Sequence, residues 1–348
     1  MVSLHPDLLA MAEAAEVLSP TTYRVLGSVR NLECTLTAID HGDRHLNTRS
    51  QMVRALQDDL YVQLYVRPTQ AAPSHVNTFA QRSLVNTLSS VNGGRGGWES
   101  GWIMVEQSKG RDGYAAMRKD GVTFMVPRND IRGHSGHLQA GELCRVRIGK
   151  EIRNLMPGYY IAIGDGDPGH GTRASASVNP ALMRLYWHLT AQGAVPFIES
   201  VTKHLNSARV PFRAKVLNAA EAYCRADAGV LYLERRWYRQ STDLLACVYR
   251  DVATVLRAET PMFARPIENG LAAAEDPANG LSFGQDRCHI VAGALWDAFA
   301  QGKTSVHARA LAITAAMRAA DLNPLRPHLG PRSQDCHRLK AALRVAES

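Results

Sequence analysis

The segment VPFRAKV, residues 210–216, carries two cations that strand geometry would point in the same direction. Side chains alternate between the two faces of a strand, so Arg213 and Lys215 share one face, while Phe212, Ala214 and Val216 share the other. Two neighbouring cations on one strand face can bind an anion. The Lys215 amine could also act as a base if nearby cations favour its neutral form. Base, anion ligand and plain surface lysine are the three roles open to it.

Positive charge is concentrated around this segment. The chain has a net charge of +8, and between Lys203 and Arg239 there are eight cations and three acids. An excess of positive charge favours an anionic partner, which could be a nucleic acid, a membrane surface or a phosphorylated substrate. For any single arginine here, a solvated position on a basic face is the simpler alternative.

A second unusual stretch is VNGGRGGWESGW, residues 91–102, with five glycines and two tryptophans. It lacks the Gly-Lys-Ser/Thr ending of a P-loop. Its glycines also lead from a helix into a strand, the reverse of a dinucleotide-binding fingerprint. We expect a tight structural corner where Trp98 and Trp102 cover the edge of the core. The alternative is a lip that contacts a peptide through Arg95.

The elements that must position these residues follow from hydrophobic periodicity. Short segments with strand spacing indicate an antiparallel meander: GWIMVEQ, GYAAMRK, GVTFMVP and ELCRVRIG, with LMRLYWHL and GVLYLE as further strands. Helical spacing occurs in DLLAMAEAAEVL, LVNTLSSVN, FIESVTKHLN, DLLACVYRDVATVLRA, HIVAGALWDAFAQG and SVHARALAITAAMRAAD. The pattern predicts an α+β fold with a central antiparallel strand meander and helices packed to one side.

Composition and motifs argue against several protein classes. No apolar run approaches the roughly 18 residues of a membrane span, and the first helix candidate lacks the basic flank of a signal peptide. We therefore expect a cytoplasmic protein without a membrane partner. The six cysteines lie far apart with no CxxC, so we expect reduced thiols and no metal site. No helix-turn-helix, ribonucleoprotein motif or zinc finger supports a nucleic-acid partner.

Several long blocks of the chain resemble a known family. PFRAKVLN, YCRADAGVLYLERRWY, TPMFARP and LAAAEDPANGLSFGQDRCHIVAGAL, with the glycine stretch, PGYYIAIGD and MRLYWHL upstream, are similar to the HopA-type effector family in its bacterial biosynthetic branch. The resemblance covers roughly residues 60 to 300. Members of that branch act with peptide kinases in class V lanthipeptide and thioamitide pathways, as phosphoserine/phosphothreonine lyases.

The resemblance implies a β-elimination that turns phosphoserine or phosphothreonine into dehydroalanine or dehydrobutyrine. The reaction needs a base, a phosphate clamp and stabilisation of an enolate. Arginine suits the clamp because its planar guanidinium binds phosphate through two parallel hydrogen bonds. The phosphate-binding candidates are Arg184, Arg213, Arg225 and Arg287, and Lys215 is the candidate base. We expect neither a metal nor an organic cofactor to be needed.

The group that protonates the leaving phosphate is a histidine or a tyrosine in this scheme. His188 in LYWHL is the first candidate, because imidazole titrates in the required range. His170 and His289 are further candidates. Tyr160 and Tyr186 could serve instead, or could steady the enolate through their hydroxyls. The alternative is a structural role, since a lone histidine is more often structural than catalytic and an aromatic residue within a strand is more often part of the core.

The segment AEDPANGLSFG, residues 274–284, precedes a predicted helix. Free amides and the positive end of the dipole favour anions at a helix start, so Ser282, together with the amides of Phe283 and Gly284, could complete a phosphate pocket. Glu275 and Asp276 could orient the cations or receive a proton. The alternative is that both acids cap helices or pair with nearby arginines.

The expected organisation is a helical N-terminal region at 1–60, a lyase-like domain at 61–300, and a C-terminal helix with a Pro-rich tail at 301–348 packed on the same domain. The resemblance implies a phosphorylated precursor peptide, with leader and core, as substrate and a Ser/Thr peptide kinase as partner. A non-catalytic protein-interaction module is the alternative function, since the effector branch of the family is linked to host proteins.

Overall fold

The computed structural model describes residues 4–32, 48–69, 81–107, 113–119, 122–133, 139–153, 156–166 and 182–334, together with 339, 342 and 343. Its helices are α1 (Pro6–Ala14), α3 (Thr48–Leu60), α4 (Arg82–Val91), α5 (Ala194–Ser207), α6 (Arg235–Gln240), α7 (Thr242–Val252), α8 (Phe283–Ala300) and α9 (Val306–Ala319). Short helical turns are η1 (Tyr61–Tyr65), η2 (Arg128–Asp130), η3 (Ala191–Gly193), η4 (Ala220–Ala222) and η5 (Ala253–Val255).

Within these described residues, the strands form three antiparallel sheets. The N-terminal sheet contains β1 (Ala15–Ser19), β2 (Thr22–Val25) and β3 (Ser28–Asn31). The five-stranded sheet has the order β6 (Val122–Pro127), β5 (Tyr114–Lys119), β4 (Gly97–Gln107), β8 (Leu143–Ile148) and β7 (Ile131–Gly133). The seven-stranded sheet has the order β14 (Arg265–Glu268), β15 (Leu271–Glu275), β11 (Leu182–Trp187), β13 (Gly229–Glu234), β12 (Arg213–Leu217), β10 (Tyr159–Ile163) and β9 (Glu151–Ile152).

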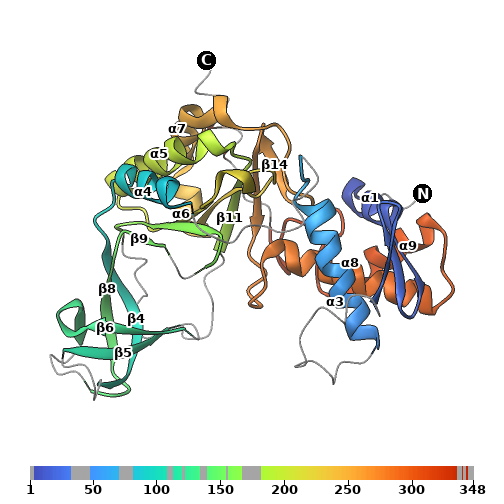
Figure 1. The fold of residues 1–348 in the computed structure, drawn as a ribbon, viewed down its shortest axis with the longest axis horizontal. Coiled ribbons are helices and arrows are strands. Elements are labelled where there is room, and N and C mark those ends of the chain that lie inside the picture. The colour runs from blue at the N-terminus through green and yellow to red at the C-terminus, as the bar shows by residue number, and fades with distance from the viewer. Residues whose placement is uncertain are drawn as a thin grey trace.

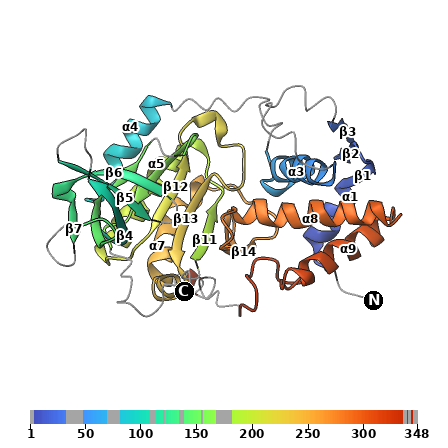
Figure 2. The same cartoon turned by 90° about the horizontal axis from the view of Figure 1, so that it is seen from below.

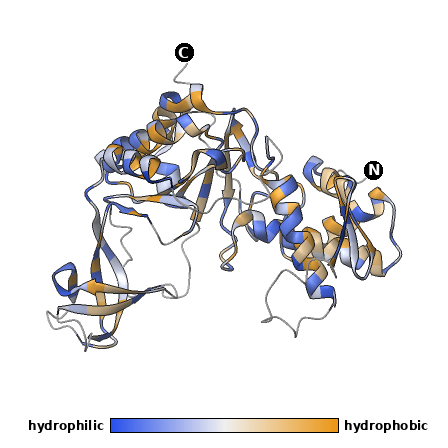
Figure 3. Ribbon diagram, viewed as in Figure 1, coloured by the Kyte–Doolittle hydropathy of each residue, from blue (hydrophilic) through white to orange (hydrophobic). Residues whose placement is uncertain are grey.

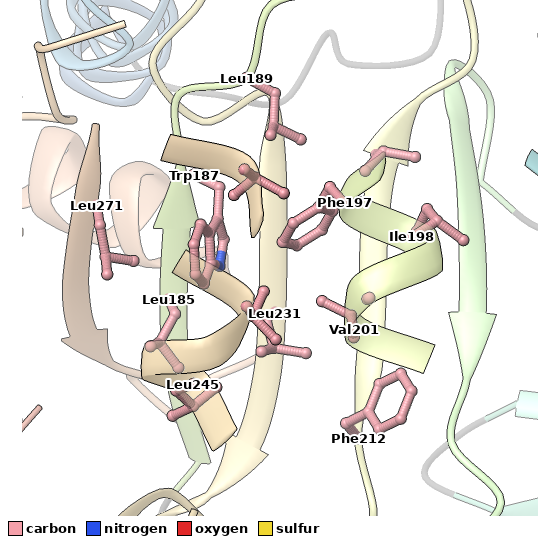
Figure 4. Close-up of a cluster of buried hydrophobic side chains, with 14 of the residues drawn as sticks. Leu185, Trp187, Leu189, Phe197, Ile198, Val201, Phe212, Leu231, Leu245 and Leu271 are labelled. Atoms are coloured by element: carbon pink, nitrogen blue, oxygen red, sulfur yellow. The ribbon is translucent and has the colours of Figure 1, made fainter. Parts of the chain in front are cut away.

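The seven-stranded sheet is the centre of the molecule. It lies between the five-stranded sheet at one end and a unit of α1, α3, α8 and α9 at the other (Figure 1). The helices α5 and α7 cover one of its faces, where the largest core cluster includes Leu185, Trp187 and Leu231 from the strands and Phe197 from α5 (Figure 4). Because side chains alternate along a strand, the strand residues that lie between these core residues point to the opposite face of the sheet. That opposite face carries Lys215 and is called the Lys215 face below.

The N-terminal and C-terminal segments share a second core. Leu8 and Met11 of α1, Leu56 of α3, Val291 of α8 and Ile313 of α9 belong to one buried cluster. The long helix α8 joins this unit to the seven-stranded sheet: it begins beside the strands and ends beside the N-terminal sheet (Figure 2). The domain boundaries expected at residues 60 and 300 stay a prediction.

The glycine stretch forms the expected structural corner between α4 and β4. Gly96 has a φ of +76°, and a Cβ on it would lie 2.3 Å from the carbonyl oxygen of Ile148, so only glycine fits. The Asp165 carboxylate accepts the amides of Arg95 and Gly96, at 2.7 and 2.9 Å, and fixes the corner. Trp102 is buried in the core of the five-stranded sheet, whereas Trp98 lies on the opposite, outer face.

The α+β fold with antiparallel sheets predicted from the sequence is confirmed, and each quoted strand and helix segment contains the expected element. One boundary differs. The first helix was expected to continue to Leu18, but it ends at Ala14, and residues 15–19 form β1. Pairing of Val17 with Tyr23 buries both side chains in the N-terminal core, and this tertiary contact outweighs the local helical pattern. Across the described residues, no helix combines the length and apolar character needed to cross a bilayer.

Candidate functional site

Lys215 lies on β12 with aromatic rings around its ammonium group. The Nζ atom is 4.2 Å from the ring centroid of Tyr159 and 6.0 Å from that of Tyr232. Tyr159 comes from β10 and Tyr232 from β13, the two strands that flank β12. Among the described residues, neither a hydrogen bond nor an ion pair is made by the ammonium of this half-buried side chain. Lys215 is therefore held by cation–π contacts and keeps its hydrogen-bond donors free for a ligand.

Arg225, Asp227 and Tyr61 form a buried polar triad beside Lys215. Arg225 pairs with Asp227 through its Nε and, at 2.9 Å, through its Nη2. The Tyr61 hydroxyl donates to Asp227 at 3.0 Å and accepts from Arg225 at 3.1 Å. Tyr61 belongs to the π-helical turn η1, where its ring stacks on that of Tyr65 at 5.2 Å. The triad thus ties η1 to the segment that leads into β13.

The charges of the triad extend to Lys215. Burial alone would raise the pKa of Asp227, but the positive charges of Arg225 and Lys215 and the hydrogen bonds from Arg225 and Tyr61 outweigh burial and hold that pKa below its ordinary value. Burial raises the pKa of the Tyr61 hydroxyl, and the Asp227 charge adds to the rise. The site therefore holds an ionised carboxylate, a guanidinium and a neutral phenol next to Lys215.

Arg184 occupies the Lys215 face on β11. Its Nε donates to the Asp276 carboxylate at 2.6 Å, and its Nη2 also pairs with Asp276. Its guanidinium carbon lies 5.2 Å from the ring centroid of Tyr232, its direct cross-strand neighbour. Tyr232 therefore stands between Arg184 and Lys215. Burial would lower the pKa of Arg184, but the neighbouring Tyr186 and Tyr232 hydroxyls and the Asp276 carboxylate outweigh burial and raise that pKa, so the guanidinium stays charged.

Tyr186 and His188 follow Arg184 on the same face but are buried. The Tyr186 side chain lies beside Tyr65, and burial raises the pKa of its hydroxyl. The His188 ring is fully enclosed, and its Nδ1 is 2.9 Å from the backbone oxygen of Glu259. Its Nε2 has no hydrogen-bond partner in the described residues, and burial lowers the pKa of the imidazole. Neither ring is open to solvent, although both residues point toward the Lys215 side of the sheet.

Arg213 shares the face with Lys215, as predicted, but it turns toward the five-stranded sheet. Its Nη2 donates to Glu99 of β4 at 3.0 Å. Glu99 also accepts from Lys119 at 2.9 Å and from the indole of Trp102 at 3.2 Å. Burial would raise the pKa of Glu99, but Lys119 and Arg213 lower it below its ordinary value. Arg213 is thus a link between the two sheets.

Tyr160 and Glu275, two of the predicted site residues, lie on the face of the sheet opposite Lys215. Tyr160 points to the opposite face of the sheet, because in β10 it is Tyr159 that has the same orientation as Lys215. The Tyr160 hydroxyl donates to Glu151 at 2.6 Å and accepts from Asn92 at 2.9 Å, so it stabilises the β9 edge. Glu275 also faces away, and it accepts from the backbone amide of Gly330 at 2.8 Å. Its carboxylate holds the C-terminal tail in place.

Arg287 is buried, and its hydrogen bonds go to other parts of the protein. Its side chain is 1% exposed and pairs with Asp286, while its Nε and Nη2 donate to the carbonyls of Pro327 and Leu329 at 2.9 and 3.0 Å. It therefore anchors the tail, and each of its three guanidinium nitrogens already has a partner within the chain, which the prediction of a phosphate ligand did not anticipate. The sequence does not distinguish an arginine that binds phosphate from one that anchors a neighbouring segment, because both occur in helices with the same local pattern.

Ser282 serves as the N-cap of α8. Its hydroxyl accepts the Gln285 amide at 3.2 Å, and the Gln285 side chain accepts the Ser282 amide at 3.0 Å, so the two residues form a capping box. The helix start still lies near the site, because a Cβ on Gly284 would be 2.3 Å from the Tyr65 ring and 2.7 Å from the Tyr61 ring. Ser282 therefore supports the tyrosines indirectly.

The two remaining histidine candidates are not among the residues that surround Lys215, which are called the Lys215 cluster below. His170 lies outside the described residues. His289 is exposed on α8 and contacts Gln57 of α3 at 2.9 Å. No group of three His, Cys, Asp or Glu side chains suited to a metal ion occurs in the described parts of the chain.

Sequence reasoning missed four residues of the cluster: Tyr61, Tyr159, Asp227 and Tyr232. For one of them a signal was present, because Asp227 lies two residues after Arg225. The choice of Tyr159 over Tyr160 depends on the register of β10 with β12, which is not a local property of the sequence. Tyr61 contacts Asp227 from 166 residues earlier in the chain, and Tyr232 faces Lys215 through the register of β12 with β13; a single sequence reveals neither relationship.

Comparisons with known proteins identify one family and two similar solved structures. A sequence model of the HopA1 effector protein family matches residues 151–329, more than half of the chain, and that range includes all seven strands of the central sheet. The chain is similar to the solved structure of the effector protein from Pseudomonas syringae pv. tomato strain DC3000, with 13% identity, a TM-score of 0.42, and 86% of this chain and 95% of that chain covered. It is also similar to the effector protein from Pseudomonas syringae pv. syringae strain 61, with 12% identity, a TM-score of 0.41, and coverage of 82% and 96%. No curated protein gives a significant match.

Proposed function

Because the chain belongs to the HopA1 effector protein family, we propose that it carries out on the Lys215 face the chemistry implied for the biosynthetic branch of that family: elimination of phosphate from a phosphoserine or phosphothreonine peptide. The observation that carries the proposal is the position of Lys215. It is a half-buried cation without a carboxylate partner in the described residues, and the triad and Arg184 lie close to it. A phosphate dianion would complement this arrangement.

The reaction balances without an oxidant or reductant. A base removes the proton from the α-carbon, the Cα–H electron pair forms the Cα=Cβ double bond, and the Cβ–O bond breaks. Phosphate leaves with the bridging oxygen and the electrons of the broken bond. The product is dehydroalanine from phosphoserine or dehydrobutyrine from phosphothreonine. The enolate-like charge that develops on the peptide carbonyl needs a cation or hydroxyl nearby.

Two roles of Lys215 fit this chemistry. As an amine, it would take the α-proton. As an ammonium, it would bind the leaving phosphate, since its donors are free and it stands between two tyrosine rings. The two roles differ in whether an arginine at position 215 could replace the lysine, because an arginine keeps the charge but does not readily take a proton.

The arginines would act mainly through charge and position. Arg225 and Arg184 are paired with Asp227 and Asp276, so each brings a carboxylate as well as a cation. A phosphate would have to use the outer donors of Arg184 or displace Asp276. In this proposal, Arg225 keeps Asp227 and Tyr61 in place, and Arg184 is the arginine that contacts the substrate.

The experiment that tests the function uses a synthetic peptide with one phosphothreonine and its phosphoserine counterpart. The chain is incubated with each, and mass spectrometry follows the loss of phosphoric acid. A parallel reaction contains the unphosphorylated peptide with the partner Ser/Thr kinase and ATP, because the proposed natural substrate is a precursor peptide phosphorylated by such an enzyme. Elimination that needs Lys215 supports the proposal. Absence of elimination from every phosphorylated peptide, including the kinase product, contradicts it.

A second candidate function is a non-catalytic protein-interaction module. It is favoured by one observation: Arg184, Arg213, Arg225 and Arg287, the four arginines expected to bind phosphate, are all paired with carboxylates of the chain itself. In that case the cluster would stabilise the sheet, and the chain would act through its surface. This role would be supported if phosphopeptide did not change the thermal stability of the Lys215→Ala variant and if that variant bound a protein partner as tightly as the natural chain does.

A further inference from the structure

The outer face of the five-stranded sheet combines basic and aliphatic side chains. This face is opposite the buried cluster that contains Trp102, Met117 and Val146. Strand register places on it the exposed side chains of Arg118, Arg132, Arg145 and Arg147, with Glu106 as the acid. Among the described residues, four guanidinium groups against one carboxylate make the face positive.

Exposed aliphatic residues lie among these arginines. Ile103 of β4 and Leu143 of β8 are direct cross-strand neighbours and are 45% and 61% exposed. Met125 of β6 is 51% exposed, and Ala116 of β5 separates it from β4. Hydrophobic and hydrophilic residues therefore occur side by side on this sheet (Figure 3). Large aliphatic groups that stay in water on one sheet face indicate a contact surface.

The tryptophan of the glycine stretch completes the face. Trp98 of β4 is half-buried on the outer side, and the guanidinium carbon of Arg132 lies 4.1 Å from its ring centroid. Among the described residues, no carboxylate forms an ion pair with Arg118, Arg132 or Arg147. Arginine, tryptophan and methionine are the residue types enriched where proteins bind proteins.

We propose that this outer face docks an acidic peptide segment that carries aliphatic side chains. The acidic residues would pair with the arginines, and the aliphatic ones would cover Ile103, Leu143 and Met125. Nucleic acid fits less well, because exposed aliphatic side chains at the centre of the face offer nothing to phosphate and little to stack on bases. Charge complementarity and the apolar centre thus select the same partner.

The docking surface is separate from the Lys215 face. Glu99 and Trp102 point to the inner side of the five-stranded sheet, and Glu99 reaches Arg213 of the central sheet. The outer face is turned to the opposite side. A peptide docked there would bind through a segment that does not react. The docking proposal is therefore independent of whether elimination occurs at Lys215.

The test measures peptide binding by fluorescence anisotropy on the full chain. The probe is a fluorescein-labelled peptide of about 18 residues, rich in Glu and Ser, with leucines spaced three and four residues apart. A peptide with Lys in place of Glu and a labelled single-stranded DNA oligonucleotide are the comparison ligands. Of the three ligands, we expect only the acidic peptide to bind well, and we expect its affinity to fall as the salt concentration is raised.

Two surface variants locate the binding. Arg118→Glu with Arg147→Glu reverses charge and should weaken acidic-peptide binding about tenfold or more. Ile103→Ser with Leu143→Ser should also weaken it severalfold, because it removes the apolar contact. Matched controls are Arg82→Glu with Arg239→Glu, and Leu311→Ser with Leu325→Ser, exposed pairs elsewhere that should leave affinity unchanged.

Specific outcomes overturn the proposal. Equal binding of acidic and basic peptides, or full affinity in both outer-face variants, would place the contact elsewhere. DNA binding that depends on Arg118 and Arg147 but not on Ile103 and Leu143 would make the face a nucleic-acid surface. Circular dichroism melting of each variant separates lost contact from lost folding. Phosphoric-acid loss is measured on the same samples, so failure of docking and failure of the lyase proposal are distinguished.

Discussion

The Lys215 Nζ lies 4.2 Å from the ring centroid of Tyr159, on the neighbouring strand β10. This contact and the 6.0 Å approach to Tyr232 hold the ammonium between two aromatic faces without using its hydrogen-bond donors. A lysine fixed in this way is positioned for a ligand at little entropic cost, because its chain is already ordered.

Replacement of Lys215 separates its two proposed roles. Lys215→Ala should abolish elimination in both. Lys215→Arg keeps the cation but removes a group that can readily take a proton. If Lys215 is the base, the arginine variant should lose activity by roughly 10²–10⁴-fold, as the alanine variant does. If Lys215 binds phosphate, the arginine variant should retain a measurable fraction and show mainly a raised KM. Initial rates of phosphoric-acid loss over a range of peptide concentrations decide between them.

The Lys215 cluster shows how far sequence reasoning reaches. The alternation in VPFRAKV correctly paired Arg213 with Lys215 on one face, because strand parity is a local property. The same parity, applied to β10, would have selected Tyr159 over Tyr160, but the pairing of β10 with β12 joins segments about fifty residues apart and has no local signal. Buried arginines such as Arg287 were counted as ligands because burial and ion pairing depend on the packed fold.

The Arg225 and Asp227 pair should show strong energetic coupling. Arg225→Met leaves a buried carboxylate without its cation, which typically costs roughly 3–5 kcal/mol of unfolding free energy. Asp227→Asn leaves the guanidinium uncompensated and should also destabilise. The double variant should be more stable than the sum of the two losses predicts, since it leaves no buried charge. Urea unfolding of the four proteins measures the coupling, and additive losses would show that the pair is not the stabilising unit.

Acid should destabilise the fold partly through Asp227. Its folded pKa is below the ordinary value of 3.8, so the unfolded state binds protons more readily. The stabilisation is therefore complete above pH 3.8 and is lost as pH falls below it toward the folded pKa. Urea unfolding at several pH values should show a steeper decline below pH 3.8 for the natural chain than for Asp227→Asn. Identical slopes would mean that Asp227 is not the coupled group.

Gly284 at the start of α8 should tolerate no side chain. A Cβ there would lie 2.3 Å from the Tyr65 ring and 2.7 Å from the Tyr61 ring, so Gly284→Ala must shift the tyrosines that support the triad. We expect a loss of about 1–3 kcal/mol and reduced elimination. Gly293→Ala on the same helix is the control, because its Cβ would meet only the Arg49 side chain at 3.8 Å. That variant should be neutral or more stable by about 0.5–1 kcal/mol. Equal thermal melting of the two variants would contradict the packing argument.

Glu99 should matter more for stability than Arg213, although the two are paired. Glu99 faces two cations and an indole, and its side chain and that of Lys119 are only 14% and 9% exposed. Glu99→Gln would leave Lys119 partly buried without its counter-charge, which typically costs about 1–3 kcal/mol. Arg213→Ala removes a side chain that is 57% exposed, and such pairs contribute at most about 1 kcal/mol. Thermal melting compares the two. If Arg213→Ala lowered the melting temperature more than Glu99→Gln does, the stability of the contact between the sheets would depend mainly on Arg213. The counter-charge of Glu99 would then contribute little to the burial of Lys119.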